Sequence, residues 1–260
     1  MNTFSMYVAR ESGLHQLHPL TKALLTLLLL VSGLTLPGNW TGYFLVLFVI
    51  IPLAAWGKIL PNLLRVVWGL SLPFIIPVLI IQSLFWGKGT PIFEFWIIAP
   101  KAEGALYALI IVGRILLVMA GFMLFAMTTR PDTLMISLKQ VGLPSSLAYI
   151  IVTTLQIVPR FQSKASTILD AQRSRGVETE GNLLVRARAV VPVILPLVLG
   201  SLVEVEERAI AIEARGFNST KKETSLIEIP DSNSQVLLRR TFIILMIVCI
   251  LARITWQLLN

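Results

Sequence analysis

The sequence predicts an all-α polytopic membrane protein, in which a bundle of transmembrane helices is joined to long cytoplasmic helices. Hydrophobic residues make up 55% of the 260 residues and charged residues only 14%, with a mean hydropathy of +0.80. A soluble domain has about 25% charged residues. Charge-free stretches recur along the chain, whereas most charged residues lie between residues 130 and 240. Composition, charge-free runs and charge clustering therefore all favour this fold class.

The first two spans form a predicted helical hairpin. Residues 23–57 contain no charged side chain, and Pro37-Gly38-Asn39 interrupts them. Proline and glycine break helices, and asparagine suits turns. We expect one span that ends near Leu36 and a second over residues 42–56. Both are shorter than the roughly 20 residues of a perpendicular span, so flanking residues must help or the bilayer must thin locally.

Two further spans contain residues that are unusual inside apolar helices. The third, over residues 66–87, contains Pro73 and Pro77, which kink a membrane helix and free carbonyls for neighbouring helices to satisfy. The fourth, over residues 105–128, contains Arg114. A charge inside a span is a functional candidate. The structural alternative is a guanidinium bonded to helix-end carbonyls of a neighbour, since buried charges are normally paired.

Basic residues predict the orientation of the spans, because positive charge is retained on the cytoplasmic side. Lys22 flanks the first span, Lys58 follows the second and Arg130 closes the fourth, while the loop between the first two spans has no charge. The N-terminus is therefore expected inside, and a last span over 241–259 leaves the C-terminus outside.

The chain is accordingly divided into three parts. Residues 1–129 hold the four N-terminal spans, residues 130–238 form a cytoplasmic or interfacial domain, and residues 239–260 hold the C-terminal span. Within the middle part, the charge-free stretches 140–159 and 189–203 each run into a charged amphipathic helix. Helical spacing of apolar residues predicts that these two long helices end near residues 175 and 215.

Each of the two long helices ends in an arginine–glycine step, and the two steps lie 40 residues apart. A cation suits the last turn of a helix, and glycine readily adopts the left-handed φ that follows. A single step is an ordinary helix end. A matched pair, in a membrane protein with no visible energy source, predicts two equivalent docking tips. The tip residues are Ala171, Ser174, Arg175, Gly176, Ala211, Ala214, Arg215 and Gly216.

The sequence lacks the motifs of an ATPase or of an ion-coupled transporter. The steps Gly57-Lys58 and Gly87-Lys88 have neither the upstream glycine nor the following Ser or Thr of a P-loop. The four N-terminal spans contain no Asp, Glu or His, which a secondary transporter uses to carry protons or sodium.

Signals for a metal site, an enzyme or nucleic-acid binding are similarly weak. His15 and His18 could share a helix face, but a metal needs further ligands, and the single Cys249 offers no thiolate cluster. The net charge of +8 is not accompanied by interleaved aromatics or a nucleic-acid module. We predict a non-enzymatic membrane subunit with no metal, no cofactor and no nucleic-acid partner.

Four segments of the chain match the signatures of a known family. They are Leu17-His18-Pro19-Leu20-Thr21-Lys22, similar to L-D-P-x-T-K with His18 in place of Asp; Thr128-Thr129-Arg130-Pro131; the stretch from Val141-Gly142-Leu143-Pro144 through Pro159-Arg160-Phe161 and Asp170-Ala171-Gln172 to Arg175-Gly176; and Ala214-Arg215-Gly216. On these segments the chain resembles the transmembrane coupling subunit, or T component, of energy-coupling factor (ECF) transporters, the vitamin and metal importers of prokaryotes.

The resemblance implies a division of labour among subunits. Two cytoplasmic ABC-type ATPases, as a homodimer or a heterodimer, would bind ATP and Mg²⁺ and dock on the two tips, with Arg175 and Arg215 as the central contacts. A membrane S component would bind the micronutrient and be reoriented by ATP-driven motion of the coupling helices. The chain itself would lie in the prokaryotic cytoplasmic membrane. The alternative is a permease of a conventional ABC importer, which predicts one short coupling loop with an E-A-A…G signature.

Overall fold

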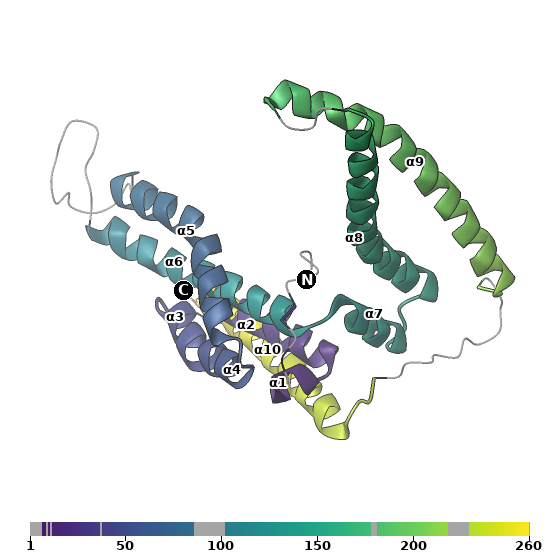
Figure 1. Cartoon of the computed structure of the whole chain (residues 1–260). Helices are drawn as coiled ribbons and strands as arrows, with labels where there is room; N and C mark the ends of the chain where they lie inside the picture. Colours follow the sequence, from purple (N-terminus) through teal and green to yellow (C-terminus); the bar gives the residue numbers. More distant parts are fainter. Residues whose placement is uncertain are drawn as a thin grey trace. The chain divides into compact units, whose positions relative to one another are not determined.

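The computed structural model describes residues 7–8, 10, 12–36, 38–85, 102–177, 181–217 and 229–259. All regular structure in these ranges is helical (Figure 1), as the sequence predicts. The helices divide into two compact units. One unit contains α8 (Ser145–Ser174) and α9 (Leu183–Ala214), and the other contains the remaining helices. The domain limits expected at residues 130 and 239 stay a prediction.

The larger unit begins with short apolar elements. After α1 (Gly13–Gln16) comes α2 (Pro19–Thr35). The second expected span is the continuous run of α3 (Thr41–Leu45), the π-helix η1 (Val46–Ile50) and α4 (Ile51–Trp56). A π-helical turn widens the helix locally. Both α2 and the run to Trp56 are short apolar helices, as their charge-free lengths indicate.

The longer helices of this unit are α5 (Leu60–Phe85), α6 (Ala102–Thr128) and α10 (Asn233–Leu259), with α7 (Pro131–Gln140) after α6. By length and composition α5, α6 and α10 could each cross a membrane, and so could residues 189–214 of α9. The last segment falls in the part of the chain expected to be cytoplasmic or interfacial. The chain is therefore a multi-pass membrane protein.

The core of the larger unit lies around α6. Buried side chains from α2, η1, α4, α5 and α6 form one apolar cluster. The approach of α3 to α6 is set by two glycines, because a Cβ on Gly42 would lie 2.5 Å from the backbone of Gly113. Small residues at such crossings let membrane helices pack closely. Tyr43 donates from its hydroxyl to Leu109 O at 2.8 Å across the same crossing.

Lys22 joins three helix ends at one side of this unit. Its side chain is only 5% exposed. The Nζ donates to His15 O at the end of α1 (3.0 Å) and to Thr128 O at the end of α6 (2.9 Å). The carbonyls at a helix C-terminus lack helical partners and carry partial negative charge. The ammonium group therefore fixes the start of α2 against the end of α6.

Arg114 does not make the contacts expected of it. It lies half-buried in α6, and no hydrogen bond or ion pair joins it to the described residues. The predicted bonds to helix-end carbonyls of a neighbour are therefore absent from this part of the chain. Lys22 makes such bonds instead.

Candidate docking site at two helix ends

The two arginine–glycine steps have the same backbone geometry. Gly176 and Gly216 adopt positive φ angles of 87° and 70°. The N–H of Val177 donates to Gln172 O (3.0 Å), and that of Gly176 donates to Arg173 O (2.9 Å). This pair of bonds is a Schellman motif. The same pair recurs after α9, where Phe217 donates to Ile212 O (3.3 Å) and Gly216 to Glu213 O (2.9 Å).

A third helix end separates the role of the glycine from that of the arginine. At the end of α7, Gly142 has a φ of 114°, and Leu143 N–H donates to Leu138 O at 3.0 Å. The residue before this glycine is Val141 rather than arginine. Helix termination thus explains Gly176 and Gly216, since only glycine adopts this φ readily. Termination does not require Arg175 or Arg215.

Both arginines are exposed and have no hydrogen-bond or ion-pair partner among the described residues. Their neighbours behave differently. Arg173 pairs with Asp170 one turn earlier (3.3 Å), and Ser174 Oγ donates to Asp170 O (3.1 Å). The other tip residues are exposed as well: Ala171, Ser174, Gly176, Ala211, Ala214 and Gly216. The tips therefore present two guanidinium groups that no described residue binds.

The helices α8 and α9 form an antiparallel pair. Near the connection between them, Gln172 Nε2 donates to Pro192 O (3.5 Å). This carbonyl lacks its helical donor because Pro196, four residues later, has no N–H. At the opposite end, the rings of Tyr149 and Phe217 lie 5.3 Å apart.

The antiparallel arrangement places the two tips at opposite ends of the pair. Arg175 follows the last residue of α8, whereas Arg215 follows the last residue of α9, close to Tyr149 at the start of α8. The 30 residues of α8 correspond to about 45 Å at the helical rise of 1.5 Å per residue. One small partner surface cannot cover both tips, so the geometry favours two contacts.

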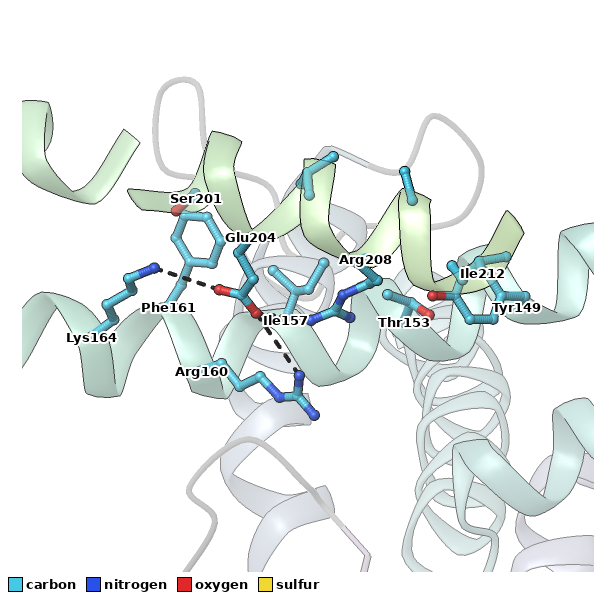
Figure 2. A pocket seen from close by; sticks show the side chains of 12 residues that line it. Tyr149, Thr153, Ile157, Arg160, Phe161, Lys164, Ser201, Glu204, Arg208 and Ile212 are labelled. Atoms are coloured by element: carbon cyan, nitrogen blue, oxygen red, sulfur yellow. Dashed lines mark hydrogen bonds and ion pairs between the residues drawn. The ribbon is translucent and has the colours of Figure 1, made fainter. Parts of the chain in front are cut away.

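Glu204 lies at the middle of the pair, where three cations surround it. Arg208 Nη2 donates to its carboxylate at 2.8 Å, Lys164 Nζ at 3.5 Å, and Arg160 lies at 4.0 Å. Figure 2 shows Glu204 of α9 between Lys164 and Arg160 of α8. Lys164 Nζ also donates to Gly200 O at 3.0 Å. We call these five residues the Glu204 cluster.

The Glu204 cluster is equally far from both tips along its helices. Lys164 precedes Arg175 by 11 residues, and Glu204 precedes Arg215 by the same number. Each interval corresponds to about 16 Å of helix. A groove of about 260 Å³ runs beside the cluster, with Tyr149 and Phe161 in its wall. The cluster therefore fixes the crossing from which both tips extend.

Only part of this arrangement is evident from the sequence. The Glu204–Arg208 pair is evident from the helical i,i+4 spacing. The contacts of Lys164 and Arg160 with Glu204 were missed, because they cross between helices whose register the sequence does not specify. The 40-residue interval shared by Lys164 and Glu204 with the two tips is a signal that could have indicated them.

Much apolar surface of α9 is uncovered within its unit. Large side chains on several faces are more than one-third exposed: Val190, Val191, Ile194, Leu195, Val198, Leu199, Leu202, Val203, Val205 and Ile210. Contiguous apolar surface of this kind marks contact with a membrane or with another protein.

Together, the apolar helices and the long α8–α9 pair define a multi-pass helical membrane protein. Residues 10–226 match the family described as cobalt transport protein, and the chain belongs to this family. Among described residues, no group of three His, Cys, Asp or Glu side chains could hold a metal ion.

Curated relatives carry the name energy-coupling factor transporter transmembrane protein EcfT. The relative from Clostridium kluyveri is 29% identical, covering 98% of this chain and 97% of its own length. The relative from Lactococcus lactis subsp. cremoris is 28% identical, covering 94% of this chain and 95% of its own length. The relative from Listeria innocua is 27% identical, covering 84% of this chain and 85% of its own length. The resemblance to ECF T components seen in the sequence is confirmed.

Proposed function

We propose that this T component transmits ATP-driven motion of two cytoplasmic ABC-type ATPases to an S component, for the uptake of a vitamin or another micronutrient across the prokaryotic cytoplasmic membrane. One observation carries the proposal: two helix ends of identical geometry each present an exposed, unpaired arginine among the described residues, at opposite ends of one helical pair. Each ATPase would take one tip. ATP and Mg²⁺ would be held by these partners, and the chain itself would be non-catalytic.

The chemistry of the arginine side chain supports a docking role. A guanidinium is planar and can bond a carboxylate through two parallel hydrogen bonds, which a lysine cannot reproduce. The Schellman turn removes the chain from the helix axis immediately after each arginine, so a partner surface can approach the helix end. The exposed apolar surface of α9 would contact the S component or the bilayer.

A permease of a conventional ABC importer is supported less well. Such a subunit would present one short coupling loop with an E-A-A…G signature, which the sequence lacks. It would also have no need for two matched helix ends.

The proposal is tested by alanine and lysine substitutions at both tips, in the complex with two ATPases and an S component. Arg175→Ala and Arg215→Ala should each weaken ATPase binding by about 2–5 kcal/mol, because a carboxylate in the partner loses its cation. Lysine should restore little of this loss. The double alanine variant should lose ATPase binding or, at minimum, the coupling of hydrolysis to uptake.

Arg173→Ala is the matched control, because Arg173 lies in the same helical turn but pairs with Asp170 inside α8. It should leave assembly and uptake near wild type. A double Arg175→Ala, Arg215→Ala variant that assembles and transports like wild type would contradict the docking role. Both arginines would then be ordinary helix-end charges, each contributing about 0.3–1 kcal/mol of local helix stability.

A second experiment addresses the division of labour. The purified chain alone should neither bind nor hydrolyse ATP, because its sequence has no P-loop. Equilibrium binding of a fluorescent ATP analogue measures this directly. Nucleotide binding above the level of a heat-denatured sample would contradict the proposal.

A further inference from the structure

A cavity of about 390 Å³ lies in the larger unit between α2, the η1–α4 segment and α10. Most of its wall is apolar and includes Leu25, Phe48, Leu53 and Phe242. Thr21 and Lys22, in the first turn of α2, also line it. The cavity therefore has an almost wholly apolar surface, with Thr21 and Lys22 at one end of it.

Thr21 presents a buried hydroxyl that no described residue satisfies. The residue is 2% exposed, and its Oγ1 has no hydrogen-bond partner among the described residues. Thr26, one turn later, donates to Lys22 O at 3.0 Å, the usual bond of a helical threonine to the preceding turn. Thr21 has no preceding helical turn because α2 begins at Pro19. A buried hydroxyl without a partner is unfavourable, so this group indicates a missing ligand.

Lys22 adds a cation to the same end of the cavity. Its ammonium group has three donors, and the two contacts with His15 O and Thr128 O leave one hydrogen available. Within the described part of the chain, no carboxylate pairs with Lys22. Buried charges normally have a counter-charge, so the site favours an anion.

The cavity crosses the polar–apolar boundary of two neighbouring helices. The charge-free run of α2 begins at residue 23, and that of α10 begins at residue 241, just after Arg239 and Arg240. In α2, the lining residues Thr21 and Lys22 lie before this boundary and Leu25 lies after it. In α10, the lining residue Phe242 lies after the boundary. A lipid has the same division, between its headgroup and its acyl chains.

We propose that this cavity binds one anionic phospholipid, with its phosphodiester held by Thr21, Lys22 and the N-terminal end of α2, and one acyl chain along the apolar wall. Basic pockets between transmembrane helices on the cytoplasmic side hold such headgroups, and a helix N-terminus favours a phosphate. The lipid would lie beside the contact of α2 with α10, at the side where Lys22 fixes α6. This inference does not rest on the docking of ATPases.

The test uses the full chain in detergent, titrated with phosphatidylglycerol or with phosphatidylcholine of the same acyl chains. Thermal stability and lipid retention in native mass spectra are the two readouts. Phosphatidylglycerol should raise the melting midpoint by much more than phosphatidylcholine does. Thr21→Val, which keeps the shape of the side chain, should weaken phosphatidylglycerol binding about tenfold, the effect of one hydrogen bond to a charged group.

Thr26→Val is the matched control, because its hydroxyl bonds inside α2 and it does not line the cavity. It should keep the full response to phosphatidylglycerol. Lys22→Met should abolish the response to phosphatidylglycerol. If the Lys22→Met variant does not fold, the Thr21→Val variant still decides the test. The proposal is overturned if both lipids act equally, or if Thr21→Val raises the midpoint without lipid and leaves phosphatidylglycerol binding unchanged.

Discussion

His18 occupies the position where the L-D-P-x-T-K signature of the family has aspartate, and its contacts show what the imidazole does there. Its Nδ1 accepts from Leu20 N–H (3.3 Å), which caps α2, and faces Arg239 Nη1 at 3.4 Å. Arg239 also pairs with Asp231. Both neighbours of Nδ1 are donors, so this nitrogen must be unprotonated to accept from them. The residue is a neutral N-cap in place of a charged one.

This geometry predicts that acid destabilises the chain. Burial lowers the pKa of His18 below 6.5, Asp231 raises it, and Arg239 and Lys22 lower it further. Burial is also the main cause of the lowered pKa of His15. The unfolded chain then binds more protons than the folded chain between the lowered folded pKa and 6.5. Stability is fully present above pH 6.5 and is lost as the pH falls below it.

The melting midpoint of the purified chain should therefore decrease as the pH is lowered from about 7.5 to about 5.5, the interval in which histidine takes up its proton. His18→Asp should show a smaller fall, because aspartate stays ionised over most of this interval. A midpoint that is constant or rises on acidification would contradict the neutral-cap interpretation.

The capping role of residue 18 is tested at neutral pH. His18→Ala removes the acceptor for Leu20 N–H and should destabilise the fold by about 0.5–2 kcal/mol. His18→Asp should be neutral or stabilising, since aspartate is a preferred N-cap and would offer a carboxylate to Arg239. Chemical denaturation of the three proteins in the same detergent gives the order. Equal stability of the alanine variant and wild type would refute the cap.

At the scale of elements, the Glu204 cluster determines how the two tips are held. The Glu204 side chain is 41% exposed, so each ion pair contributes only about 0–1 kcal/mol. Removing the carboxylate also leaves three neighbouring cations without their shared anion. Glu204→Gln should therefore loosen the crossing of α8 and α9 more than it unfolds either helix.

The loosening can be measured with spin labels at Ser174→Cys and Ala214→Cys in a Cys249→Ser background. The wild-type chain should give a narrow distance distribution, and Glu204→Gln should broaden it. Glu207→Gln is the matched control, because Glu207 is exposed on α9 and outside the cluster. Unchanged distributions in all three proteins would show that the cluster does not position the tips.

The elements divide into those that the sequence specifies locally and those that it does not. Charge-free runs and glycines predict the helices and their ends, because helix formation and termination depend on nearby residues. The contact of His18 with Arg239, 221 residues apart, and the contact of Lys164 with Glu204, 40 residues apart, depend on packing between helices, which the local sequence does not specify. The sequence predicts a partner for Arg114, yet the helix-end carbonyls in the described structure are taken by Lys22.

At the scale of the whole molecule, three helix ends of the larger unit define a common side. Lys22 at the start of α2 bonds Thr128 O at the end of α6. His18 N–H donates to Gln235 Oε1, near the start of α10, at 2.6 Å. The first span and the last span therefore begin at the same side, and the fourth span ends there. Basic residues flank this side, which favours the cytoplasm.

The last prediction follows from this shared side. If α2 enters the membrane from the cytoplasm, α10 does so too, and the C-terminus lies outside. A cysteine at Asn260, in a Cys249→Ser background, should react with an impermeant thiol reagent in intact cells. Ser174→Cys, at the first tip, should react only after the membrane is permeabilised. Protection of the cysteine at position 260 in intact cells would reverse the direction of α10, and labelling of position 174 without permeabilisation would place the tips on the wrong side for cytoplasmic ATPases.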